Sequence, residues 1–419
     1  MLIKMKYWKK LSANERLKRI QKALKENIDF NQDASLGYPA SRLDEKVFTN
    51  ESLFLKEMPV LQSFIANPNH IGCHTIGSSE TAFNGTQEIE REVLKMIAID
   101  LFKAKENNFD GYISPGGTEA NIQAIWMYRN FFMKQEQAKL EEIGIIASED
   151  THYSIPKAAN LLMLDYLKIP IDKFSRKIDE NQLKNIVLAS LAKGKKFFIV
   201  VANMGTTMFG SVDNPNIYTD FLEEYHLSYQ LHIDGAYGGF VYPFSEEENT
   251  INFENDKISS LTIDAHKMLQ APYGTGIFIC RKGLMENVMT KDAEYIEGFD
   301  FTLCGSRSGA NAVAVWTILT TYGPHKWFEK VSVLKMRTNW LCKQLDLLGI
   351  HYFREPKMNI VTIQAEYISP KIAKKYNLVP QKHNENNQWY KIVLMEHVEL
   401  EHLKDFTVEL SKQKCFQNI

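Results

Sequence analysis

The alternation of apolar and polar positions divides the chain into helix-length and strand-length segments. Near the N-terminus, apolar residues recur at helical spacing between Trp8 and Lys25, which predicts an amphipathic helix. A loop-rich stretch follows, as far as the polar segment Asn67–Asn84. From about Glu88 onward, helix-length segments alternate with short apolar strands. This alternation predicts a mostly parallel sheet that is covered by helices on both faces.

The pattern also predicts how the chain is divided into domains. Near Phe301 it changes to a smaller α+β region that ends at Ile419. We therefore expect a helical and extended segment over 1–70, a large domain over 71–300 and a small C-terminal domain over 301–419. Helices are expected over Glu88–Lys105, Glu119–Lys134 and Ala310–Thr321, and strands over Gly111–Ser114, Ile143–Ser148, Phe197–Ala202, Tyr229–Ile233, Leu261–Ile263 and Gly276–Cys280.

The composition is that of an ordinary globular protein. Of its 419 residues, 44% are hydrophobic and 24% are charged. The 49 basic and 51 acidic residues leave a net charge of −2, which gives no bulk electrostatic attraction to nucleic acid or an anionic membrane. The apolar runs are also shorter than a bilayer-spanning helix requires. We therefore expect a small-molecule substrate, with no nucleic acid and no membrane as partners.

The N-terminus and the cysteines indicate a cytoplasmic protein. The basic start MLIKMKYWKK lacks the apolar core and the cleavage site of a signal peptide. The 5 cysteines are scattered without a CxxC pair, which fits reduced thiols better than a disulfide framework or a zinc site. Since no cluster of His, Cys and Asp has metal-ligand spacing, we expect a cytoplasmic enzyme without a metal.

The first segment with candidate chemistry is SPGGTEAN, residues Ser114–Asn121. It follows a predicted strand and opens a predicted helix. Such a turn leaves backbone N–H groups and the positive helix end free to bind a phosphate, and the hydroxyl of Thr118 adds a further donor. Taken alone, the segment also fits an ordinary helix cap after a glycine turn.

Two later segments add a carboxylate and a lysine. In HIDGAYGG, Asp234 ends a predicted buried strand, where a carboxylate needs a positive partner such as a protonated pyridine nitrogen. Taken alone, Asp234 fits a capping role equally well. In TIDAHKM, Lys267 follows a strand between apolar residues, where partial desolvation would favour the neutral amine that imine formation needs. Together, the segments supply a phosphate cradle, a pyridinium partner and an imine lysine, each at a strand end.

From about Asn67 to Val398 the chain resembles the group II decarboxylases of fold type I that depend on pyridoxal 5′-phosphate (PLP). The resemblance rests on GGTEAN, DTHYS around His152, GTT, HIDGAYGG, DAHKM and GSRSG. The run SLTIDAHKM and the late segment IVLMEHV are most similar to compact tyrosine/aspartate-decarboxylase-like proteins. The resemblance implies a mostly parallel, seven-stranded α/β sheet, a small C-terminal α+β domain and PLP as the cofactor.

The resemblance also implies a role for each matching residue. Lys267 would hold PLP as a Schiff base, Asp234 would pair with the pyridinium nitrogen, and His152 would stack on the ring. Further cofactor contacts would come from Gly117, Thr118 and His266 at the phosphate, Ala236 on the other ring face, Thr206 near the ring hydroxyl or Asp234, and Ser306 of a partner subunit. A homodimer with active sites at the subunit interface is therefore expected.

The substrate side is implied by four more residues. Tyr295 falls where the family carries a mobile-loop tyrosine that protonates the carbanion, and a packed loop aromatic is the alternative. Candidate substrate contacts are His70, His74 and Thr75, with ordinary loop hydrogen bonding as the alternative for the histidines. Lys391 stands where relatives often carry an arginine for the substrate carboxylate, and a lysine binds a carboxylate only as a point charge.

The resemblance also leads to an expectation for Asp264. It stands three residues before Lys267, where the family often has serine or asparagine. Because a phosphate repels a carboxylate, we expect Asp264 to point elsewhere.

The preferred reaction is decarboxylation of an L-amino acid to its amine and CO₂, with an aromatic substrate such as tyrosine favoured. Aspartate, histidine and diamino acids remain open, whereas His152, in place of the glutamine common in glutamate decarboxylases, disfavours glutamate. Carbon–carbon cleavage of the sphingosine-phosphate-lyase type is the main alternative, although neither the extra cationic patch nor the membrane anchor of such lyases is evident. His152 together with the pair His266-Lys267 disfavours an aminotransferase or a cysteine desulfurase. The intact set Lys267, Asp234 and His152 disfavours a non-catalytic scaffold.

Overall fold

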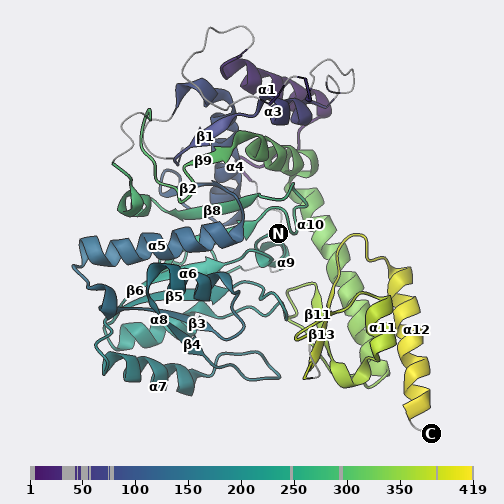
Figure 1. The fold of residues 1–419 in the computed structure, drawn as a ribbon. Coiled ribbons are helices and arrows are strands. Elements are labelled where there is room, and N and C mark those ends of the chain that lie inside the picture. The colour runs from purple at the N-terminus through teal and green to yellow at the C-terminus, as the bar shows by residue number, and fades with distance from the viewer. Residues whose placement is uncertain are drawn as a thin grey trace.

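The computed structural model describes residues 5–30, 43–44, 46–48, 55, 58–73, 75, 80–245, 249–291, 296–383 and 386–417. It shows a large body built around one sheet and a smaller C-terminal domain beside it (Figure 1). The seven strands of the large sheet lie in the order β2 (Phe109–Ser114), β8 (Gly276–Arg281), β7 (Ile258–Asp264), β6 (Ser228–Asp234), β5 (Phe197–Asn203), β3 (Ile143–Ser148) and β4 (Asp165–Ile169).

The sheet is mostly parallel, as the sequence predicts. Strands β7, β6, β5, β3 and β4 pair in parallel, whereas β8 runs antiparallel to both of its neighbours, β7 and β2. Strand β2 therefore points in the same direction as the parallel strands. As a result, the carboxyl ends of six strands meet at one edge, which is the edge where open α/β sheets bind ligands.

Helices cover both faces of the sheet because the strands are apolar on both sides. In β5, Phe198 and Val200 face one core cluster and Ile199 and Val201 face the other. The second cluster is covered by α5 (Gly117–Gln135) and α6 (Ser154–Leu162). The first is covered by α4 (Asn84–Lys95), α7 (Glu180–Leu191), α8 (Pro215–Glu224) and α10 (Gly309–Leu347).

The N-terminal segment packs against this body. Helix α1 (Ala13–Glu26) begins at a capping box formed by Ser12 and Glu15, and it lies against α3 (Pro59–Ala66) and α4. Beyond α4, a π-helix over Met96–Leu101 takes the place of the expected continuation to Lys105. Strand β1 (Asn69–Ile71) pairs antiparallel with β9 (Ser306–Ser308), so the segments before and after the large sheet are joined.

Helix α10 connects the large body to the small domain (Figure 1). It is bent where Gly323 adopts a φ of 67° and Pro324 follows, because neither residue continues the helical hydrogen-bond pattern. Residues up to Leu334 belong to the core of the large body, beyond the expected boundary at residue 300. The domain limits at residues 70 and 300 stay predictions.

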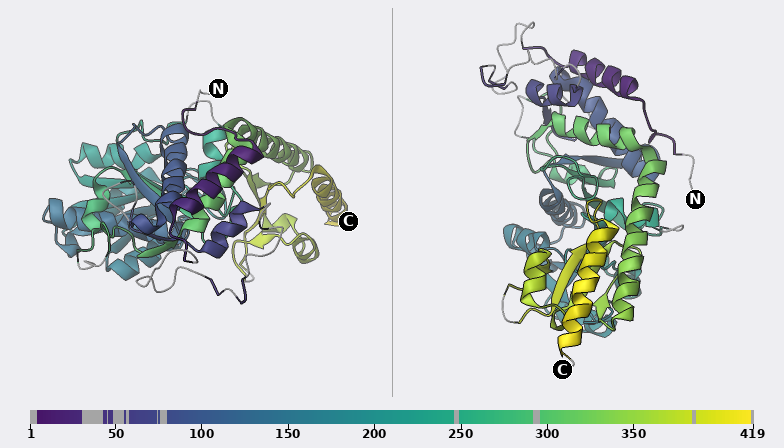
Figure 2. Two further views of the ribbon diagram at one scale, coloured as in Figure 1. Left: turned by 90° about the horizontal axis from the view of Figure 1, so that it is seen from above. Right: turned by 90° about the vertical axis from the view of Figure 1, so that its right-hand side faces the viewer.

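The small domain contains a four-stranded antiparallel sheet. Its order is β10 (Tyr352–Phe353), β11 (Ile360–Gln364), β13 (Trp389–Val393) and β12 (Val379–Pro380). Helices α11 (Pro370–Lys375) and α12 (Leu400–Gln417) and the end of α10 share its core. Figure 2 shows α12 at the far end of the molecule from α1.

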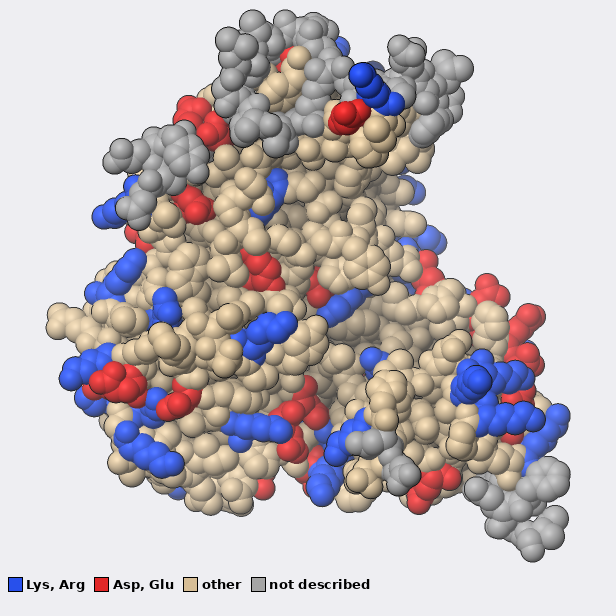
Figure 3. All heavy atoms as spheres, viewed as in Figure 1, with Lys and Arg blue, Asp and Glu red and all other residues tan. Residues whose placement is uncertain are grey.

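The face drawn in Figure 3 shows no dominant charge. Basic and acidic side chains are interspersed over it. Within the described ranges, no helix is long and apolar enough to cross a membrane, and no group of three His, Cys, Asp or Glu side chains could hold a metal ion.

Candidate active site

The three motif segments meet at the carboxyl edge of the large sheet. Strand β2 leads through Pro115 and Gly116 into the N-terminus of α5, β6 ends at Asp234, and β7 ends at Asp264, three residues before Lys267. Gly116 has a φ of 140°, a conformation that favours glycine and turns the chain into the helix. The order β2-β8-β7-β6 thus gathers segments that are far apart in the sequence.

Lys267 lies in an ion pair at this edge. Its Nζ is 2.9 Å from Oδ2 of Asp264, and its side chain is 33% exposed. The other oxygen of Asp264, Oδ1, accepts a hydrogen bond of 2.5 Å from the backbone N–H of Gly117. Asp264 therefore occupies the N-terminus of α5, where the sequence predicts a phosphate cradle. This differs from our expectation that Asp264 points elsewhere, because the N–H group of Gly117 and the amine of Lys267 both attract the carboxylate.

Asp234 is buried and has only neutral donors around it. It is 6% exposed, and its Oδ2 accepts from Nδ2 of Asn121 at 2.9 Å while its Oδ1 accepts from the backbone N–H of Ala236 at 3.1 Å. Among the described residues, no Lys, Arg or His nitrogen lies within ion-pair distance of Asp234. A buried carboxylate is costly without a positive partner.

Asn121 organises a hydrogen-bond network behind Asp234. Its Nδ2 donates to Asp234 and to Oγ of Ser154 at 2.9 Å each, so its Oδ1 is the acceptor for Nε2 of His232 at 3.0 Å. The His232 proton is thus placed on Nε2, and Nδ1 accepts from Oγ of Ser260 at 2.6 Å. Burial lowers the pKa of His232 to about 4, so the ring is neutral.

The same network orients His152. The backbone N–H of Ser154 donates to Nδ1 of His152 at 3.3 Å, so this nitrogen is an acceptor, and the hydroxyl of Ser154 donates to it at 2.9 Å while accepting from Asn121. The neutral His152 ring therefore carries its proton on Nε2. Burial is the main reason that the pKa of His152 is lowered, and the charge of nearby Lys267 lowers it further against the opposing effect of Asp234.

His152, Lys267 and Asp264 line a cleft of about 490 Å³, whereas Asp234 and Asn121 are not part of its wall. Predicted cofactor residues that line it are Gly117, Thr118, His152, His266 and Lys267. His266 is held by a hydrogen bond from Nδ1 to the carbonyl oxygen of Thr275 at 3.1 Å. Apolar side chains of Ile122, Tyr153 and Leu303 form other parts of the wall.

Glu119 adds a second carboxyl group to the wall of this cleft. The hydroxyl of Tyr112 donates to both of its carboxylate oxygens, at 3.1 and 3.0 Å. Burial raises the pKa of Glu119 to about 7, and the hydrogen bond from Tyr112 opposes this increase. Glu119 therefore exchanges a proton near neutral pH. The sequence analysis assigned no role to Glu119, Asn121 or Ser154, because their partners come from distant segments.

Three further candidates lie near this edge. Thr206 exchanges a hydrogen bond of 2.7 Å with Ser211 in the turn after β5. Lys391, on β13 of the small domain, donates from Nζ to the carbonyl oxygen of Thr207 in the same turn at 3.0 Å. Burial lowers the pKa of Lys391, and the charge of Lys267 lowers it further. Ser306 is exposed on β9.

The substrate candidates of the N-terminal segment are engaged elsewhere. His70 is 1% exposed, and its ring nitrogens contact Oε2 of Glu90 at 2.9 Å and Oγ1 of Thr86 at 2.8 Å. Neither nitrogen is available to a substrate, so His70 is a structural residue in this arrangement. Thr75 donates to Asp110 at 3.2 Å. His74 and Tyr295 lie outside the described residues.

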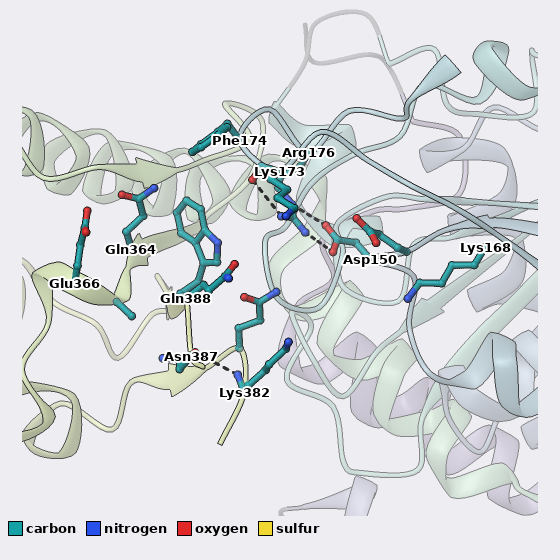
Figure 4. A pocket seen from close by; sticks show the side chains of 14 residues that line it. Asp150, Lys168, Lys173, Phe174, Arg176, Gln364, Glu366, Lys382, Asn387 and Gln388 are labelled. Carbon is teal, nitrogen blue, oxygen red and sulfur yellow. Dashed lines mark hydrogen bonds and ion pairs between the residues drawn. The ribbon is translucent and has the colours of Figure 1, made fainter. Parts of the chain in front are cut away.

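A second cleft, of about 690 Å³, lies behind the loop that carries His152, between the large body and the small domain (Figure 4). On its inner wall, the guanidinium of Arg176 binds both carboxylate oxygens of Asp150, at 2.9 and 2.5 Å. Arg176 also stacks on the ring of Phe209 at 3.6 Å, and Phe209 contacts Trp389 of β13. This stack connects the small domain to the loop of His152.

Comparison with known proteins agrees with this geometry. The profile of the pyridoxal-dependent decarboxylase conserved domain matches residues 45–360. The chain belongs to this decarboxylase family. A tryptophan decarboxylase of Clostridium sporogenes is 52% identical over 408 residues, which cover 97% of this chain and 98% of that protein. A probable L-tyrosine/L-aspartate decarboxylase of Methanococcus maripaludis is 31% identical over 352 residues, 80% and 86% of the two chains.

Solved structures share the fold of this decarboxylase. L-methionine decarboxylase from Streptomyces sp.590, complexed with L-methionine methyl ester, has a TM-score of 0.72 at 19% identity, covering 95% of this chain and 93% of its own. Oryza sativa TDC with PLP and tryptamine has a TM-score of 0.71 at 15% identity, covering 96% and 95%. The predicted α/β fold type I, the group II family and the PLP-dependent amino-acid decarboxylase activity are confirmed.

The residues at the carboxyl edge of the large sheet carry groups that could bind PLP. Buried Asp234 lacks a cationic partner among the described residues, and a protonated pyridine nitrogen would supply one. The N-terminus of α5 offers backbone N–H groups for the phosphate, at a turn where a side chain on Gly117 would come within 2.8 Å of Asp264. Lys267 lies three residues beyond the end of β7, the strand that pairs with β6, which ends at Asp234. These residues offer groups suited to the pyridine nitrogen, the phosphate and the aldehyde of PLP, the confirmed cofactor of this decarboxylase.

Proposed function

We propose that the preferred substrate of this decarboxylase is an aromatic L-amino acid, with L-tryptophan first. One observation carries this proposal: a protein named tryptophan decarboxylase is 52% identical over 97% of the chain. Tyrosine, the aromatic substrate that the sequence analysis favours, is the second candidate, because the 31% identical archaeal relative is named for tyrosine and aspartate.

The cleft supports an aromatic substrate through its apolar walls. Ile122 lies one turn into α5, Leu303 comes from the segment before β9, and the ring of Tyr153 lies 4.0 Å from that of His152. Leu303 is fixed by a hydrogen bond of 2.8 Å from its backbone N–H to Oε1 of Gln123. An indole or phenol ring gains free energy when it leaves water for such surroundings.

The residues at the carboxyl edge of the large sheet would have different roles in catalysis. Bound PLP supplies an electron sink for the electron pair that remains at Cα when CO₂ departs. Lys267 would hold the cofactor, Asp234 would keep a proton on the pyridine nitrogen, and His152 would stack on the ring. Thr118, Gly117 and His266 would bind the phosphate, Thr206 and Ala236 would flank the ring, and Ser306 would reach the phosphate from a partner subunit.

Two residues would act on the substrate itself. Lys391 would attract the α-carboxylate as a point charge, which its partial burial and its hydrogen bond to the turn after β5 support. Tyr295 would donate the proton that replaces the carboxylate at Cα. His152, which lines the cleft and carries its proton on Nε2, is the alternative donor for this step.

Release of CO₂ from a panel of L-amino acids tests the proposal. The PLP-loaded protein should turn over L-tryptophan fastest, then L-tyrosine, and Lys267→Ala should abolish release. A higher kcat/KM for aspartate, glutamate or histidine than for either aromatic substrate would contradict the proposal while leaving decarboxylation intact.

We also infer a cytoplasmic homodimer. Ser306, Tyr153 and Tyr273 are exposed around the cleft, Tyr153 at 63% and Tyr273 at 89%, which supports coverage by a second subunit. The described cysteines Cys73, Cys280, Cys304 and Cys342 are free thiols, which suits a reducing compartment. Size-exclusion chromatography should give twice the mass of one chain, and a fully active monomer would contradict the dimer.

A further inference from the structure

The most informative feature outside the roles assigned above is Asp264, whose carboxylate lies where a phosphate should bind. Its Oδ1 accepts from the N–H of Gly117 at 2.5 Å, at the first residue of α5. The N-terminus of a helix binds anions because its N–H groups have no partner within the helix and its dipole is positive there. Asp264 therefore uses the anion position of α5 for a group of the protein itself.

The second oxygen of Asp264 reaches the reactive lysine. Oδ2 lies 2.9 Å from Nζ of Lys267, and Nδ1 of His266 lies 3.7 Å from Oδ1. One carboxylate thus contacts both groups that the cofactor needs: the N–H that would bind the phosphate and the amine that would form the Schiff base. Asp264 is 4% exposed, so it cannot turn into bulk solvent without a local rearrangement.

We propose that Asp264 is a built-in competitor for the phosphate of PLP, so that the cofactor binds only when this carboxylate leaves Gly117 and Lys267. The phosphate carries about −1.5 to −2 charge at neutral pH, and a carboxylate at the same N–H repels it. Loading with PLP is therefore weaker than the cradle alone would permit. This inference rests on the proposed assignment of the phosphate to the N-terminus of α5.

Asparagine has nearly the same shape as aspartate but no charge, so Asp264→Asn tests the effect of the charge alone. The protein is freed of PLP, and PLP is then titrated back while the visible absorbance of the bound cofactor is recorded. We expect Asp264→Asn to bind PLP about tenfold more tightly, as removal of one repulsive contact predicts. Pyridoxal, which lacks the phosphate, competes with Asp264 only at Lys267, so Asp264→Asn should improve its binding by a smaller factor than it improves the binding of PLP.

The comparison of the two ligands identifies the cause. If Asp264 acted only through Lys267, asparagine would change the binding of pyridoxal and PLP equally, and the proposal would be wrong. Weaker binding of PLP by Asp264→Asn would also overturn it. Asp110→Asn is the matched control, because Asp110 is buried and its Oδ2 accepts from the backbone N–H of Gly283 at 2.8 Å, outside the cleft. This control should leave the affinity for PLP unchanged.

Two additional measurements distinguish a wrong assignment of the phosphate site from a wrong proposal for Asp264. Inorganic phosphate should raise the Tm of the cofactor-free Asp264→Asn protein more than that of the wild type, since a ligand that binds only the folded state stabilises it. Thr118→Val should weaken PLP binding in both backgrounds if the cradle assignment is correct. If Thr118→Val left PLP binding unchanged, the assignment of the phosphate to the N-terminus of α5 would be wrong. If only Asp264→Asn left PLP binding unchanged, that assignment would stand and the proposal that Asp264 competes with the phosphate would be wrong.

Discussion

The side-chain amide of Asn121 donates a hydrogen bond to the buried carboxylate of Asp234 over 2.9 Å. The same amide also fixes Ser154 and His232, so one residue of α5 determines the arrangement of groups on β6 and on the loop after β3. The cofactor's expected partner and the expected stacking ring are therefore oriented by a single side chain.

Replacing this amide should weaken both folding and cofactor binding. Asn121→Leu leaves three buried polar groups short of a partner, and we expect the free energy of unfolding to fall by about 2–4 kcal/mol. Denaturant unfolding measures that loss, and a PLP titration measures the affinity. The control Asn130→Leu removes an amide from the same helix that donates to the carbonyl of Asn287, and it should leave PLP binding unchanged.

The raised pKa of Glu119 predicts a pH-dependent stability. The folded protein keeps the proton of Glu119 up to about pH 7, whereas the unfolded chain releases it near its ordinary pKa of 4.5. The folded state binds more protons in this window, so its stability falls as the pH rises from about 5 to about 7. The loss should be about 1–3 kcal/mol and should be absent in Glu119→Gln. Tm measured across this range tests the difference.

Removal of the charge of Lys391 should affect substrate binding more than chemistry. Lys391→Met is expected to raise KM by about tenfold with a smaller change in kcat, because the α-carboxylate carries its full charge in the bound substrate and loses it as CO₂ departs, so the contact stabilises mainly the ground state. Lys382→Met, which removes an exposed lysine from the second cleft, is the control. A pure decrease in kcat would show that Lys391 acts through the Thr207 turn instead.

The pair of Arg176 and Asp150 can be tested with a double-mutant cycle. Arg176→Met leaves the carboxylate of Asp150, whose side chain is 12% exposed, without its cation, and we expect a loss of about 3 kcal/mol in unfolding free energy. Asp150→Asn in the same chain should recover much of that loss. An additive double mutant would show that Arg176 stabilises the protein through Phe209 rather than through Asp150.

The sequence predicts the strands of the large sheet better than it predicts strand direction or which side chains meet at the candidate site. Every expected strand is present within three residues of its predicted bounds, because each is a buried apolar run. Strand β4 is missed, since its sequence DYLKI lies at the sheet edge and carries charged residues. The antiparallel direction of β8 depends on how the chain returns to the sheet and has no local signal.

In the candidate site, too, the residues marked by local motifs were predictable and the contacts between distant segments were not. Lys267, Asp234 and the start of α5 are recognisable because a short motif marks each of them. The position of Asp264 on Gly117 depends on the register between β7 and the turn after β2, two segments separated by 147 residues. The burial of His70 likewise results from Glu90 and Thr86 on α4, which no local pattern connects to β1.

The bent helix α10 has a consequence for how the protein unfolds. Its first part contributes Val313 and Trp316 to the core of the large body, and its end contributes Leu341 and Leu345 to the core of the small domain. One continuous stretch of chain is thus required by both cores, so melting either core frays the helix on which the other depends. The two domains should therefore lose structure in a single cooperative transition, although multidomain chains commonly unfold in steps.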